Sequence, residues 1–185
     1  MDKQISTNAI GGIFYFKHYR NDKLIAEGKQ HNIFVNEGLV YALNSAFGVS
    51  VGGAPSPLVS WYVGLSTANR QWNANDDAAN VHNDSNEFQG YSESTRQLWL
   101  PQDLAITSNI HLSNVNAEAT YNITTAATLY GGFIISNGSK AGTGDTGSIL
   151  AAGANFNDGA VDTPRAVLIG DVFKVGYVLS TEDKV

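Results

Sequence analysis

The chain has 185 residues, of which 43% are hydrophobic and only 15% are charged, and its formal net charge is −6. This length suits one domain with its own core, and the apolar content excludes a disordered chain. The acidic balance disfavours nucleic acid as a partner, the absence of cysteine excludes disulfides and thiol chemistry, and no apolar run approaches the roughly 20 residues that span a membrane.

The N-terminal part predicts an arm followed by a β-hairpin. Residues 1–12 are polar and punctuated by glycine, so we expect a short arm that orders only on binding, ahead of a single β-rich domain over 13–185. Residues 13–20 are aromatic and strand-forming, the Asn-Asp-Lys run at 21–23 is a turn signal, and residues 24–31 can return as the second strand.

The aromatic residues of this hairpin fall on both of its faces. By the two-residue period of a strand, Phe14 and Phe16 share one face, whereas Tyr15 lies on the other. A small domain rarely leaves two such faces in water. We therefore predict that one face meets the core and the other a partner, and that the protein is a homo-oligomer, with a trimer as the natural case. The candidate partner contacts are Phe14, Phe16 and Tyr19.

Residues 36–47 predict an amphipathic helix, the one helix that we expect in the chain. Asn36 is a suitable N-cap, Glu37 suits the positive end of the helix dipole, and Gly48 suits the end of the helix. We expect Leu43 to be fully buried against the sheet. It belongs to an apolar stripe of helical period that consists of Leu39, Val40, Leu43, Ala46 and Phe47.

A long polar stretch at 68–90 has little periodicity and predicts a functional or mobile loop. Trp72 lies in this loop and is the candidate for an exposed contact residue, whereas Trp61 and Trp99 lie in apolar strand contexts and are expected in the core. The loop lacks the spacing of a calcium-binding loop, so we favour a solvated loop held by side-chain-to-backbone bonds over a cation site. The side chains considered as ligands are Asn73, Asn75, Asp77, His82, Asp84 and Glu87.

The rest of the chain predicts short strands separated by turn signals. They are expected at 60–66, 94–100, 104–112, 118–123, 129–136, 148–152, 165–170 and 172–179. This pattern indicates a mainly β fold: an antiparallel β-sandwich or jelly-roll-like domain with one amphipathic helix and an N-terminal arm or hairpin.

Some patterns resemble catalytic motifs but lack the required context. The run GTGDTG at 142–147 matches a dinucleotide fingerprint, yet it lies between two strand-like runs and not in a strand–helix unit. The run GVSVG at 48–52 matches a nucleophile elbow, yet it follows a helix and precedes a loop. The four histidines lack metal-binding spacing, and Glu87 and Glu93 are expected at the surface. We therefore expect no enzyme activity and name no catalytic residue, cofactor or metal ligand.

Five sequence segments carry a resemblance to a known family. HNIFVNEGLVYAL at 31–43 is followed by WYVGLSTA at 61–68 and YSESTRQLWLP at 91–101. The last third continues with LYGGFIISNGSKAGTGDTGSIL at 129–150 and RAVLIGDVFKVGYVLST at 165–181. In this order the segments resemble the small virion proteins of tailed bacteriophages, and the resemblance covers most of the chain after about residue 28.

The resemblance implies a non-enzymatic structural protein of the virion, assembled in the host cytoplasm, most simply a capsid decoration or cement protein. Its partners would be the major capsid protein and further copies of itself. The arm at 1–12 and the loop at 68–90 would then contact the coat protein or a neighbouring subunit, with Trp72 as an anchor. A tail, tail-fibre or baseplate component is an alternative. A carbohydrate-binding β-domain is a further one, and it would need an exposed row of aromatic side chains.

Overall fold

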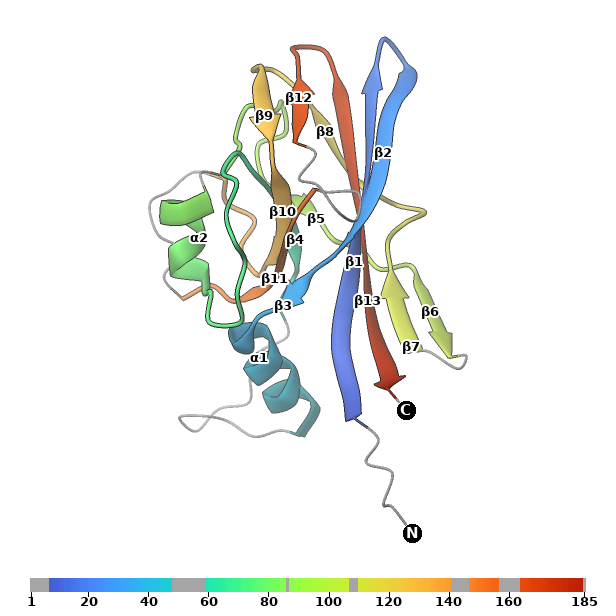
Figure 1. Ribbon diagram of the computed structural model, residues 1–185, viewed down its shortest axis with the longest axis vertical. Coiled ribbons are helices and arrows are strands. Elements are labelled where there is room, and N and C mark those ends of the chain that lie inside the picture. The colour runs from blue at the N-terminus through green and yellow to red at the C-terminus, as the bar shows by residue number, and fades with distance from the viewer. Residues whose placement is uncertain are drawn as a thin grey trace.

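The computed structural model describes residues 7–47, 59–85, 87–106, 110–140, 147–156 and 164–184 (Figure 1). Within these residues the fold is mainly β, with antiparallel strands in two large sheets that pack face to face as a sandwich, as predicted. Both described helices lie at the side of the second sheet (Figure 1). Neither of them is long and apolar enough to cross a membrane.

The first sheet is built around a long pair of strands. Its order from edge to edge is β2 (Lys23–His31), β1 (Thr7–Arg20), β13 (Val172–Lys184), β7 (Ile110–Ser113) and β6 (Asp103–Ile106), and β8 (Ala119–Asn122) also pairs with β13. β1 and β13 pair antiparallel from Thr7 opposite Lys184 to Tyr19 opposite Val172. β13 therefore joins the N-terminal hairpin to the middle of the chain.

The second sheet packs its inner face on the first. Its order is β3 (Ile33–Phe34), β11 (Leu150–Asn155), β10 (Gly131–Ile135), β4 (Tyr62–Ser66) and β5 (Gln97–Leu98), and a separate ribbon pairs β12 (Arg165–Val167) with β9 (Ala127–Leu129). Every residue of β10 is buried, because this strand is central in its sheet and is covered on both faces. Aromatic side chains fill the space between the sheets, for example Phe14 against Tyr177, with ring centroids 4.7 Å apart.

The predicted N-terminal hairpin is confirmed, and it begins earlier than expected. Asn21 and Asp22 have φ angles of 49° and 59°, which a tight two-residue hairpin turn requires and which these residue types tolerate. β1 begins at Thr7, and residues 7–12 pair with β13, so most of the expected arm is a strand. Its polar residues and glycines do not indicate a strand by themselves. The strand is ordered by its pairing with β13, which lies near the other end of the chain. Residues 1–6 lie outside the described part.

The predicted helix is present as α1 (Asn36–Phe47), but it does not pack through its apolar stripe. Leu43 is 53% exposed, so the expectation that it is fully buried is wrong. The helix approaches the second sheet at Gly38, where a Cβ would lie 2.7 Å from Ala151 Cα. Because only glycine permits this contact, the helix is held close on the side of Gly38, and the stripe turns outward.

A second helix, α2 (Ala78–Ser85), lies within the stretch that was predicted to be an unstructured loop. Asp77 caps it, with its carboxylate 2.9 Å from the backbone N–H of Asn80. The Glu37 carboxylate of α1 accepts hydrogen bonds from the backbone N–H groups of Ala78, at 3.0 Å, and of Leu150, at 2.7 Å. Glu37 thus joins both helices to β11.

A third difference concerns the range 104–112, which was expected to be one strand. The structure has two strands there, β6 and β7, which pair with each other as an antiparallel hairpin. Residues 107–109, between the two strands, are outside the described part. Apolar residues keep the same two-residue alternation on both sides of the polar run 107–109, so the pattern did not reveal the reversal.

Candidate functional site

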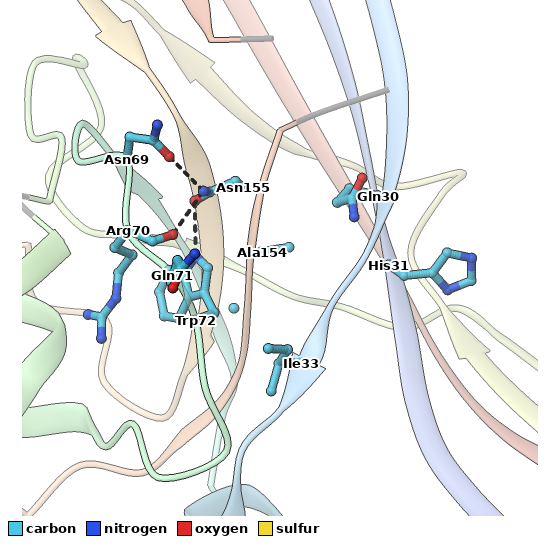
Figure 2. Close-up of a pocket in the computed structure, with 10 residues that line it drawn as sticks. Gln30, His31, Ile33, Asn69, Arg70, Gln71, Trp72, Ala154 and Asn155 are labelled. Atoms are coloured by element: carbon cyan, nitrogen blue, oxygen red, sulfur yellow. Dashed lines mark hydrogen bonds between the residues drawn. The ribbon is translucent and has the colours of Figure 1, made fainter. Parts of the chain in front are cut away.

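A cleft of about 570 Å³ opens between β2 and the end of β11 (Figure 2). The chain passes from the first sheet to the second at its floor: the Asn32 N–H donates to Gly12 O at 3.1 Å, whereas the Val35 N–H donates to Ala151 O at 2.9 Å. Above this crossing the edges of the two sheets diverge, and the cleft lies between them. Its lining includes Gln30, His31, Ile33, Asn69, Gln71 and Asn155.

Asn155 shapes one wall of the cleft by fixing the segment 69–72 against β11. Its side-chain oxygen accepts a hydrogen bond from Trp72 Nε1 at 3.2 Å, and its Nδ2 donates to Asn69 Oδ1 at 2.9 Å and to the Arg70 carbonyl at 2.8 Å (Figure 2). Both hydrogens of the Asn155 amide are therefore used within the protein, and its oxygen keeps one acceptor position.

Trp72 is only 7% exposed, so the expectation of an exposed contact residue is wrong. Its indole lies on Gly153, where a Cβ would overlap the ring. The Arg70 guanidinium lies 4.6 Å from the ring centroid, and the Phe133 ring lies 6.3 Å away. The side chain belongs to a second core cluster beneath the two helices, which explains why a tryptophan occurs in a polar stretch.

The polar side chains around Trp72 bond to one another. Asp76 lies 2.8 Å from Arg70 Nη2, and its carboxylate also accepts hydrogen bonds from the backbone and the side chain of Asn73, at 2.9 and 2.8 Å. Asn75 Oδ1 accepts a hydrogen bond from the Asn36 side chain at 2.9 Å. Within the described residues no group of three His, Asp or Glu side chains could hold a metal ion. Bonds between side chains, together with the bond to the Asn73 backbone, hold this segment together.

The hairpin residues predicted to contact a partner divide between the two faces. Phe14 and Phe16 have 0% and 1% of their surface exposed and lie in the main core, so the expectation that they are available to a partner is wrong. Tyr19 lies on the other face, where it is half-buried and where Lys174 Nζ lies 5.5 Å from its ring centroid. A partner contact at Tyr19 stays a prediction.

Trp61, Trp99 and Glu87 form no exposed sugar-binding groove. Trp99 is 7% exposed, and Trp61 is half-buried against the edge of the Tyr41 ring, with centroids 5.3 Å apart. The side chain of Glu87 is 1% exposed and forms a two-bond ion pair with Arg96, at 2.7 and 2.8 Å. The expectation that Glu87 lies at the surface is therefore wrong. The aromatic row that the carbohydrate-binding alternative needs is absent from these tryptophans.

One buried cluster, at the turn end of the first sheet, has the composition of a catalytic dyad. His18 Nε2 lies 2.7 Å from Asp171 Oδ2, and Arg20 donates to both oxygens of the same carboxylate, at 2.8 and 2.7 Å. The backbone N–H of Leu168 donates to Asp171 as well, at 2.8 Å. The Asp171 carboxylate thus has four hydrogen-bond contacts, and these connect β1 to the turn before β13. We therefore assign the cluster a role in stabilising the fold.

The Asp171 cluster predicts acid sensitivity. The Arg20 guanidinium, followed by the Leu168 N–H and by His18, holds the pKa of Asp171 well below its usual range despite its burial. A carboxyl whose pKa is lower in the folded state stabilises the fold above its unfolded pKa of about 3.9, and this contribution is lost as the pH falls through the folded pKa. We expect Asp171→Asn to lower the free energy of unfolding by about 1–3 kcal/mol near neutral pH. Urea denaturation near pH 7 and near pH 3 checks this, because the deficit must shrink in acid.

The motif-like runs and the histidines give no further site. Residues 48–52 and 142–146 lie outside the described part, and Gly147 has a φ of 91°, a value that suits a glycine in a turn. His31 is exposed at the cleft, His18 is buried with Asp171, and His111 is half-buried in β7. The structure does not bring these three together.

The outward side of α1 is an exposed apolar stripe. Val40, Leu43 and Phe47, at helical spacing, are 51%, 53% and 75% exposed. A second exposed apolar pair, Leu168 and Ile169, lies at the opposite end of the molecule, in the turn between β12 and β13 (Figure 1). These side chains were missed as surface features because the sequence does not tell which side of a helix or turn meets the core.

Comparisons with protein-family models, with curated proteins and with solved structures find no match to this chain. Its function is therefore inferred from its sequence resemblance and from its surfaces. Among the described residues those surfaces are the cleft beside β2, the outer edge of β2 and the apolar stripe of α1.

Proposed function

We propose that the protein is a non-enzymatic structural protein of a tailed-phage virion, a decoration or cement subunit that binds the assembled head between coat subunits. The sequence resemblance supplies this class of protein, and an antiparallel sandwich with little charge suits a role in binding without chemistry. The tail, tail-fibre and baseplate locations are the alternative within the same class.

The exposed apolar stripe of α1 is the observation that carries the proposal. A soluble protein gains stability by burying such side chains, so three large ones aligned on one helix indicate a surface that is covered in an assembly. Phe47 at 75% exposure is an apt anchor, because aromatic side chains dominate the binding energy of protein interfaces. The coat protein is the proposed occupant.

Binding of this kind stabilises a shell by linkage. A subunit that binds only the assembled lattice shifts the equilibrium toward that lattice, by a free energy that grows with the logarithm of its concentration relative to its Kd. The stripe of α1 then needs no catalytic group near it. It needs a fixed position on the fold, and the contacts of Glu37 and Gly38 with β11 hold the helix in place.

We expect the double variant Leu43→Gln/Phe47→Gln to bind purified heads at least about tenfold more weakly than the unaltered protein, because it loses two apolar contacts. The fold should be unchanged, since both side chains are already exposed. The matched control is Leu168→Gln/Ile169→Gln, whose side chains are 48% and 73% exposed, nearly the same as the 53% and 75% of the tested pair.

Occupancy on heads that lack the protein, measured at matched salt and protein concentration, decides between the variants. Equal occupancy of the α1 variant and its control would refute the role of the stripe. Binding of the unaltered protein to tails and not to heads, seen with a labelled subunit, would transfer the proposal to the tail alternative.

A further inference from the structure

β2 presents a free edge of the first sheet. It pairs with β1 on one side, and no described strand pairs with its other side, so the sheet ends there (Figure 1). The strand spans nine residues, from Lys23 to His31, and a β-bulge at Ile25 leaves a regular edge over residues 26–31. An unpaired edge of this length displays a row of backbone donors and acceptors that another strand can join.

The pairing with β1 determines which backbone groups point outward. The Asn32 N–H donates to Gly12 O, and the register continues with Gln30 opposite Phe14 and Gly28 opposite Phe16. In an antiparallel ladder the hydrogen-bonded positions alternate. The N–H and C=O groups of Glu27, Lys29 and His31 therefore point away from β1, toward the open side.

The exposed side chains of this edge are complementary to those of a second copy. When two identical β2 strands pair antiparallel about a two-fold axis at Gly28, Glu27 of each copy lies directly opposite Lys29 of the other. Both are outward-bonding positions, so they form a hydrogen-bonded pair with two symmetric ion pairs beside it. Gly28 meets Gly28 at the axis, where the Phe16 ring of each copy covers the space that a Cβ would take.

We propose that the protein self-associates by joining the outer edges of β2 across a two-fold axis at Gly28, which makes one sheet continuous through both subunits. A β-bulge at Ile25 interrupts the register of β2 with β1, so regular pairing between the copies is limited to residues 26–30.

The charges on β2 differ from those that natural proteins use to protect an edge. Protective charges of a single sign, lysine above all, repel a second copy. Here the two signs alternate, at Glu27 and Lys29, at the separation that converts repulsion into attraction across a two-fold axis. Lys17, the cross-strand neighbour of Glu27, makes its own ion pair with Glu118 at 2.6 Å. A two-fold contact closes at two subunits, so we propose a dimer in place of the trimer expected from the sequence.

Sedimentation equilibrium of the purified chain across the micromolar range tests the proposal, with the full charge swap as control. We expect a monomer–dimer equilibrium that weakens in high salt. Glu27→Lys alone and Lys29→Glu alone place like charges opposite each other and should weaken the dimer at least about tenfold. The double variant Glu27→Lys/Lys29→Glu has the same composition as the unaltered chain and should restore the dimer.

A proline at position 29 provides a test that does not depend on charge. The Lys29 N–H points away from β1, so Lys29→Pro leaves the hairpin ladder intact and removes a hydrogen bond of the dimer. We expect a folded monomer by circular dichroism and sedimentation. A monomer or a trimer of the unaltered chain, a double swap that fails to restore association, or a dimer that tolerates the proline would each overturn the proposal.

Discussion

Arg96→Ala is expected to lower the free energy of unfolding by about 3–5 kcal/mol, the cost of leaving a buried charge without its partner. Arg96 is 0% exposed, and its two bonds to Glu87 neutralise a carboxylate that is itself 1% exposed. Arg96 Nη1 also donates to the Asn137 carbonyl at 2.7 Å, and the guanidinium lies 5.5 Å from the centroid of the Phe133 ring. Chemical denaturation followed by tryptophan fluorescence measures the loss.

A neutral replacement of the whole pair separates the charge effect from the packing effect. Glu87→Gln/Arg96→Met removes both charges and keeps similar volumes, so it should cost less than half as much as Arg96→Ala. Equal losses for the two variants would show that packing, and not an unpaired carboxylate, sets the stability at this position.

Trp72→Ala is expected to cost about 3–5 kcal/mol, because it truncates a large side chain in a packed core. It would empty the space above Gly153 and also break the hydrogen bond to Asn155. An exposed anchor, as expected from the sequence, would give the opposite behaviour: an intact fold and weaker binding to particles. Urea denaturation of the isolated protein distinguishes the two.

An exposed apolar residue gives the control for this experiment. Ile169→Ala removes a side chain that is 73% exposed and should change the free energy of unfolding by less than about 0.5 kcal/mol. If Trp72→Ala were as mild as Ile169→Ala, the position of the indole between Gly153 and Arg70 would be wrong.

Local signals predicted the elements whose ends depend on neighbouring residues. The start of α1 was predicted to within one residue, because the signals for a helix start lie within one turn of it. Asn36 is the first helical residue and not the cap, since the first helical hydrogen bond joins the Leu39 N–H to the Val35 carbonyl and the Asn36 amide donates to Asn75. Residue 48, the expected stop, lies outside the described part. The hairpin turn at Asn21 and Asp22 was found for the same reason, since these residues accept the φ values that a tight turn needs. Asp77 was a cap signal of the same kind for α2, and it was overlooked among the ligand candidates.

Burial was not predictable where a distant residue decides it. Trp72 is buried because Gly153, on another strand, leaves room for the indole, and nothing near Trp72 in the sequence indicates this. Leu43 is exposed because the contact of Gly38 with Ala151 fixes the side of α1 that meets the sheet. The apolar stripe of a helix shows that one side will be covered, but not whether its own chain or a partner covers it.

The pairing of β1 with β13 has a consequence for how the protein is made. His18 and Asp171, which meet in the structure, are 153 positions apart in the sequence. The first hairpin therefore emerges from the ribosome long before β13, the strand that pairs with β1, is synthesised. Until then the face that carries Phe14 and Phe16 is uncovered. Contacts between such distant segments slow folding, and the uncovered hairpin is exposed to misassociation meanwhile.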